Sequence, residues 1–287
     1  MVGRVIVGTL VYICIVVLAA PFPSAAGLML TFPALNGLGF FFAERSSVGA
    51  MARSMLWLPV INGALCVGYM ITFLMLMRAT DQWVLALVLF VAVVLLWFLI
   101  AFCPEVRRGI PKHRQLPYAV ICTLVGLFLV VIAHFLLPQA SVSATDVGIF
   151  SWQSIARVVL GNKTKIVLFA AALTIFLAAV TRAPDEVRGI LAGLPLVPFG
   201  GLLSVAGFSD LDVEKQQRVF ENMLTSVALG PAVAVWFIFG FSRYLRSRRI
   251  LSSARLDRLM RFMSLIAGWM LCAIAVAAVS CALIAAS

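Results

Sequence analysis

Apolar stretches long enough to cross a bilayer recur along the whole chain. A transmembrane helix needs about 20 predominantly apolar residues to cross roughly 30 Å of hydrocarbon. Stretches that meet or approach this length without an internal Asp, Glu, Lys or Arg span residues 4–20, 24–43, 54–77, 83–102, 118–137, 166–181, 189–207, 222–241 and 262–286. The pattern predicts an all-α, polytopic membrane protein with about nine transmembrane helices.

The composition excludes a water-soluble globular protein. Of the 287 residues, 63% are hydrophobic and 11% are charged, and the mean hydropathy is +1.11. Soluble domains carry about 25% charged residues. The six cysteines form no Cys-x-x-Cys pair and have no histidine at a zinc-like spacing, so we predict neither a disulfide nor a metal site, and no other cofactor.

The positive charge predicts the orientation in the membrane. The net charge is +11, and in a membrane protein this favours anionic lipid headgroups, not nucleic acid, as the partner. When successive loops are assigned alternately to two sides, sixteen of the 22 Lys and Arg fall on one side. Lys and Arg are retained in the cytoplasm. We therefore expect the N-terminus inside and the C-terminus outside, as an odd number of spans requires.

The two halves of the chain share an internal pattern. Segments 27–33 and 189–195 both begin with Gly and end with Pro, at an offset of 162 residues, and segment 53–56 aligns with 221–224 through a shared Met-Leu at an offset of 168. This correspondence also favours an uncleaved first helix over a signal peptide at residues 1–26.

These matches predict two inverted repeats. Spans one to four correspond to spans six to nine, and because five spans separate equivalent helices, the halves must have opposite orientations. We expect a first repeat at 1–102, a connecting helix with its flanking loops at 103–165, and a second repeat at 166–287. Secondary transporters often have this plan. A duplication that only enlarged a stable helical body is the alternative.

Several residues in spans two and three resemble a known family. The pattern Ala26-Gly27-Leu28, Phe32-Pro33, Glu44-Arg45 and Arg53 is similar to that of the small GlpM-type bacterial inner-membrane proteins, which are about half as long as this chain. The similarity returns as Gly189, Leu194 and Pro195, without the Glu-Arg pair. The resemblance implies a cytoplasmic (inner) membrane protein from a group linked to envelope or exopolysaccharide phenotypes, with no catalytic residue to carry over.

Prolines in spans two and seven predict a binding site at the bilayer midplane. Pro33, Pro195 and Pro198 remove backbone hydrogen bonds, so half-helices starting near Ala34 and Phe199 would direct free amides toward an anionic group. The substrate-binding candidates near these breaks are Thr31, Pro33, Asn36, Asn62, Gly193, Pro195, Pro198 and Ser204. The alternatives are simple proline kinks, interhelical hydrogen bonds from the polar side chains, and close helix packing at the glycines.

Charged residues occupy equivalent cytoplasmic loops of the two halves. Such charges either gate a pathway and bind lipid headgroups, or only anchor helix ends. These candidates are Glu44, Arg45, Arg53, Arg182, Glu186 and Arg188.

Three functions fit this pattern. The preferred one is a transporter or flippase for an anionic small molecule or lipid-linked phosphate. The alternative is a non-transporting scaffold subunit of an envelope or exopolysaccharide assembly, with an envelope-protein partner or a second copy of the chain. A membrane-embedded transferase comes third, because nucleophile elbows, phosphate loops and metal-binding motifs are absent and only Asp210 and Asp212 form a close acidic pair outside the spans.

Overall fold

The computed structural model describes part of the chain. The described residues are 2–19, 26, 30, 52–136, 159–182, 191, 194, 196–207, 213–228, 230–247, and single positions or short runs at 260, 263, 264, 266–268, 270, 271 and 274. Within them, all regular structure is helical. The helices are α1 (Val2–Ala19), α5 (Leu58–Leu76), α6 (Gln82–Ala101), α7 (Pro104–Arg108), the 3-10 helix η1 (Lys112–Arg114), α8 (Gln115–Leu136), α10 (Lys163–Arg182), α12 (Leu196–Gly207), α13 (Val213–Ala228) and α14 (Gly230–Ser247).

The all-α prediction is confirmed for the described residues. Helices α1, α5, α6, α8 and α10 lie within a few residues of the predicted spans 4–20, 54–77, 83–102, 118–137 and 166–181. Two helical segments, Ala52–Leu76 and Gln82–Ala101, are long and apolar enough to cross a membrane. This finding gives a first indication of membrane association.

Apolar side chains on the outside of the bundle agree with that indication. On α6, Leu95 is 60% exposed and Leu99 is 72% exposed, and on α8, Leu124 and Phe128 are 61% and 64% exposed. A water-soluble helix normally turns polar side chains outward along one whole face. Contiguous apolar faces of this kind suit contact with lipid or with another apolar surface.

The helix that contains the first part of the predicted span 222–241 starts earlier than the span. α13 begins at Val213, within a stretch expected to be a polar loop, and α14 covers the second part from Gly230 on. Residue 229, between the two, lies outside the described residues. The first turns of α13 are polar on one face only, while Phe220 and Met223 are fully buried on the other, so a search for uninterrupted apolar runs misses its start.

Side chains complete the ends of two helices. Oδ1 of Asp81 accepts hydrogen bonds from the backbone N–H of Trp83 (2.9 Å) and Val84 (3.0 Å), which caps the start of α6. Nε2 of Gln216, a fully buried residue of α13, donates to the carbonyls of Val205 (2.8 Å) and Ala206 (2.5 Å) at the end of α12. The last carbonyls of a helix lack a partner within it, and Gln216 supplies one here.

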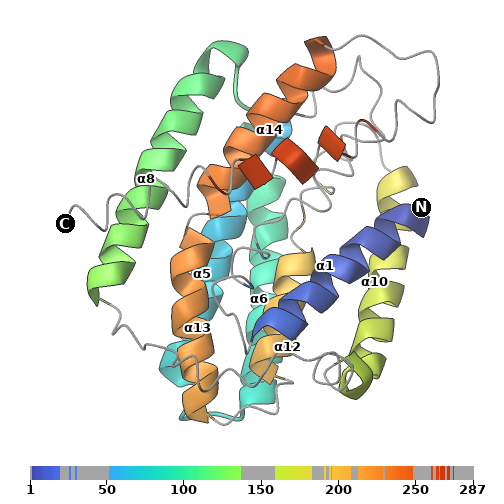
Figure 1. Cartoon of the computed structure of the whole chain (residues 1–287), viewed down its shortest axis with the longest axis vertical. Coiled ribbons are helices and arrows are strands. Elements are labelled where there is room, and N and C mark those ends of the chain that lie inside the picture. The colour runs from blue at the N-terminus through green and yellow to red at the C-terminus, as the bar shows by residue number, and fades with distance from the viewer. Residues whose placement is uncertain are drawn as a thin grey trace.

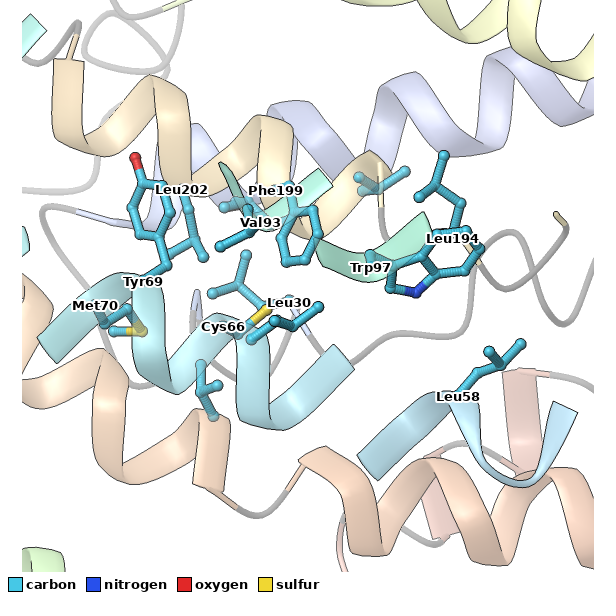
Figure 2. Packing of buried hydrophobic residues seen from close by; sticks show 14 of the residues in the cluster. Leu30, Leu58, Cys66, Tyr69, Met70, Val93, Trp97, Leu194, Phe199 and Leu202 are labelled. Carbon is cyan, nitrogen blue, oxygen red and sulfur yellow. The ribbon is translucent and has the colours of Figure 1, made fainter. Parts of the chain in front are cut away.

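The helices pack on one another in sequence from one side of the bundle to the other. α8 lies on one side, packed on α13 and α14, while α10 lies on the other, packed on α1 (Figure 1). Between them, α5 contacts α6, α13 and α14, and α12 packs on both α1 and α6. The core is dense where α5, α6 and α12 meet, with Phe199 and Leu202 of α12 facing Val93 of α6 and Cys66 of α5 (Figure 2).

Helix α5 crosses the α13–α14 pair in the antiparallel sense. Phe73 stacks on Phe220 with ring centroids 4.9 Å apart, while Gly63, earlier in α5, contacts Pro231, later in the pair. A Cβ at Gly63 would overlap the pyrrolidine ring of Pro231. The helices approach closely because this position has no side chain.

We expect Gly63→Ala to destabilise the protein by about 1–3 kcal/mol, because the added methyl forces α5 away from Pro231. Gly68→Ala is the matched control in the same helix, since a Cβ there has nothing within 4 Å. Thermal unfolding of the purified proteins in detergent measures both. Equal midpoints for the two variants would contradict the close crossing.

Candidate functional site

The polar contact at the centre of the α1, α10 and α12 packing joins Tyr12 to Ser204. The Tyr12 hydroxyl and Ser204 Oγ are 2.5 Å apart, and both residues are buried, with 2% and 6% of their surface exposed. The two residues are 192 positions apart in the chain. Ser204, a predicted substrate-binding residue, therefore makes an interhelical hydrogen bond between the N-terminal helix and the second half of the chain.

Aromatic and small residues surround this hydrogen bond. The ring of Tyr12 stacks on Phe169 of α10, with centroids 4.1 Å apart and planes 7° apart. A Cβ at Gly200 would lie 2.7 Å from the Phe169 ring, and one at Gly201 would lie 2.8 Å from Ile15. These two glycines serve close helix packing, which was one of the alternatives for the small residues of this span.

Asn62 also makes an interhelical hydrogen bond. Its Oδ1 accepts from Nε1 of Trp97 on α6 at 2.8 Å. The same type of bond joins Nε1 of Trp236 on α14 to Oγ1 of Thr123 on α8 at 2.6 Å. The bond of Asn62 supports the structural alternative for this residue.

The backbone is interrupted in span seven, ahead of Pro198. Leu191 is helical, Leu194 is not, and α12 begins at Leu196. The half-helix therefore starts three residues before the expected position near Phe199. Pro198 lies in its first turn, where a proline is tolerated because the N–H groups of the first turn have no partner within the helix.

Two residues of the predicted gating set lie in the described part. The side chain of Arg53 is exposed, and its carbonyl accepts a hydrogen bond from the N–H of Ile110 at 3.0 Å. Arg182 is the last residue of α10. The remaining candidates fall outside the described residues. They are Glu44, Arg45, Glu186 and Arg188 of the gating set, and Thr31, Pro33, Asn36, Gly193 and Pro195 of the substrate-binding set.

The described candidates do not meet at one point. Ser204 lies in α12 against α1, Asn62 lies in α5 against α6, and Arg53 lies at the start of the segment that leads into α5. What the structure brings together is the packing seam around Tyr12. Sequence reasoning did not identify Tyr12, Phe169 or Gln216, and the only local signal for Tyr12 and Gln216 was a polar atom on an otherwise apolar helical face.

Comparisons with known proteins add no relative. No family model, curated protein or solved structure matches the chain. The resemblance to the GlpM-type proteins therefore stays a prediction from the residues that carry it.

We expect Tyr12→Phe and Ser204→Ala to show a coupling energy of about 0.6–1.7 kcal/mol in a double-mutant cycle, the range found for hydrogen bonds between helices in membranes. Each variant removes one partner and preserves the packing around it. Unfolding of the two single variants and the double variant in detergent gives the value. Strictly additive effects would show that the hydroxyl pair contributes no net stability.

Proposed function

We propose that the chain is a multi-pass protein of a bacterial cytoplasmic membrane, with nine spans arranged as two inverted four-span repeats and a connecting helix. In this proposal it moves an anionic small molecule or lipid-linked phosphate across the membrane by alternating access between the repeats. The observation that carries the proposal is the contact between Gly63 and Pro231.

These two residues are related by the repeat itself. Their numbers differ by 168, the offset at which the sequence aligns 53–56 with 221–224. When two repeats are related by a two-fold axis in the membrane plane, the residues that contact their own equivalents are those next to the axis. Contact between Gly63 and its equivalent is therefore the arrangement that an inverted repeat requires.

Burial follows the same offset along both helices. In seven pairs of positions 168 residues apart, a residue in or next to α5 and its equivalent in the second half are both buried. The pairs are Met55 and Met223, Leu56 and Leu224, Leu65 and Val233, Tyr69 and Phe237, Met70 and Ile238, Phe73 and Phe241, and Met77 and Leu245.

Helices α1 and α10 support the repeat independently. They are antiparallel, because Gly8 approaches Leu173 while Tyr12 stacks on Phe169. These contacts are centred near residues 10 and 171. The separation between these two positions is close to the offset of 162 that relates spans one and six in the sequence. Equivalent helices thus meet near equivalent positions in both parts of the proposed repeat.

The helix break in span seven favours an anionic substrate. Leu194 is not helical and α12 begins at Leu196, within a predicted span rather than at its end. The first turn of a helix carries free N–H groups and the positive end of the helix dipole, which attract negative charge. Broken helices at mid-depth serve this purpose in several transporter folds.

A hydrogen-bonded chain joins the repeats on the proposed outer side. A terminal guanidinium nitrogen of Arg78 donates to Oε1 of Gln217 at 2.9 Å, and Nε2 of Gln217 donates to Oε1 of Glu221 at 2.7 Å. Arg78 follows α5 in the first repeat, while the other two residues belong to α13 in the second. The contact between Arg78 and Gln217 is exposed. Exposed polar contacts contribute little stability, as an outer gate that opens in each cycle requires.

We expect a disulfide between Arg78→Cys and Gln217→Cys to stop transport. The test uses proteoliposomes with a fluorescent phosphatidylglycerol and a short-chain polyprenyl phosphate as probes, in a chain whose exposed Cys14 and Cys103 are replaced by Ser. Oxidised protein should be inactive, and reduction of the same sample should restore the rate. Equal transport in both states would contradict an outer gate at this position.

We expect Pro33→Ala and Pro195→Ala to lower transport at least tenfold while insertion and folding persist, because a continuous helix withdraws the free amides from the midplane. Thermal unfolding of each variant supplies the control for folding. Unchanged transport in both variants would overturn the assignment of these breaks to the binding site.

One observation favours the scaffold as a second candidate. Asn62 and Ser204, two of the polar groups expected to contact substrate, are engaged in hydrogen bonds between helices. If no probe is transported and the chain co-purifies with an envelope protein in fixed stoichiometry, the scaffold replaces the transporter.

A further inference from the structure

The loop between α6 and α8 is fixed against the segment that leads into α5. The N–H of Ile110 donates to the Arg53 carbonyl at 3.0 Å, and Nε2 of Gln115 donates to the Ile110 carbonyl at 3.2 Å. Gly109 has φ +70°, and a Cβ there would lie 2.6 Å from the Arg53 backbone. Only glycine suits both this backbone conformation and this close approach, so the loop has a defined position.

This fixed loop carries a cluster of exposed cations. Arg108, Lys112 and Arg114 extend from α7 and η1, beside the exposed side chain of Arg53. Glu105 is the one acid in α7 and η1. The loop is therefore a basic surface at the end of α5 and α8 that faces the cytoplasm in the proposed orientation.

A buried hydrogen-bond donor lies one helical turn deeper. The rings of Trp57 and Tyr118 meet edge to face with centroids 5.3 Å apart. Trp57 Nε1 is buried and has no hydrogen-bond partner within the described part of the chain. An indole N–H can only donate, so Trp57 requires an acceptor oxygen.

Apolar side chains are exposed at the two helix ends that the loop joins. They are Leu99 and Phe102 at the end of α6 and Leu116 and Val120 at the start of α8. From the loop toward the middle of the helices, exposed cations are followed by the Trp57 donor and by exposed apolar side chains. An anionic phospholipid presents the matching order of phosphate, ester carbonyls and acyl chains.

We infer that the α6–α8 loop, Arg53 and Trp57 form a binding site for an anionic phospholipid of the cytoplasmic leaflet. The cations of Arg53, Arg108, Lys112 and Arg114 bind the phosphate, and Trp57, a partly exposed residue, turns its N–H to an ester oxygen. A soluble phosphate would satisfy the cations but would leave the apolar surface uncovered. The inference rests on the proposed membrane orientation and is independent of transport.

The test is lipid binding to the purified full-length chain in detergent, measured by native mass spectrometry. The probes are phosphatidylglycerol, phosphatidylcholine and glycerol 3-phosphate. We expect phosphatidylglycerol to bind at least tenfold more tightly than the other two. Equal binding of phosphatidylcholine, or tighter binding of glycerol 3-phosphate, would overturn the inference.

Two variants separate this site from general attraction to positive charge. Arg108→Ala/Lys112→Ala/Arg114→Ala should weaken phosphatidylglycerol binding more than tenfold, whereas Lys163→Ala/Lys215→Ala/Arg218→Ala removes the same charge on the proposed outer side and should leave it unchanged. Equal losses in both triple variants would refute a specific site.

Trp57→Phe tests the buried donor, because it keeps an aromatic ring and removes only the N–H. We expect about threefold to fivefold weaker phosphatidylglycerol binding with an unchanged unfolding midpoint. Unchanged binding would contradict the role of Trp57. Labelling of Lys112→Cys from the cytoplasmic side of inverted vesicles checks the orientation directly, so failure of the topology is distinguished from failure of the lipid site.

Discussion

The close antiparallel crossing of α5 with α13 and α14 is the contact on which the rest of the described bundle depends. In the proposed membrane location, helices gain no hydrophobic free energy from association, so their packing relies on van der Waals contact at short range. Gly63 permits this range by leaving room for the ring of Pro231. From the crossing, α5 extends the packing to α6, while α13 and α14 extend it to α8. The arrangement of the outer helices therefore depends on a position with no side chain.

Three pairs of polar side chains inside the bundle satisfy each other in the same way. Tyr12 with Ser204, Asn62 with Trp97, and Thr123 with Trp236 are neutral pairs on different helices, each joined by a single hydrogen bond. Neutral pairs avoid the larger cost of placing a charge in hydrocarbon. Each pair also fixes the rotation of one helix relative to its neighbour. If the protein moves a substrate, a change in helix rotation must break or exchange some of these bonds.

The sequence predicts the helices best where an apolar run coincides with one unbroken helix, as in α5 and α6. It fails for α13, because the buried face of Phe220 and Met223 alternates with charged residues and the average hydropathy is low. A run of apolar residues therefore predicts a helix more reliably than it predicts where the helix starts. The number of spans and their orientation remain predictions.

The candidate site was less predictable than the helices, for a physical reason. A polar residue in an apolar helix is recognisable in the sequence, and Asn62 and Ser204 were recognised. Whether it contacts a substrate or another helix depends on its partner, and the partner of Ser204 is 192 residues away. The predicted repeat offset differs in this respect, because it relates distant positions through the amino-acid sequence alone. Gly63 and Pro231, which are in contact, are separated by this offset.

The hydrogen bonds of Gln216 have a mechanical consequence. Because this side chain of α13 holds the last carbonyls of α12, the end of one helix and the beginning of the next form a single stiff corner. Bending is then easier at the interruption around Leu194 than at this corner. A displacement of α12 is therefore transmitted to α13 through the side chain of Gln216.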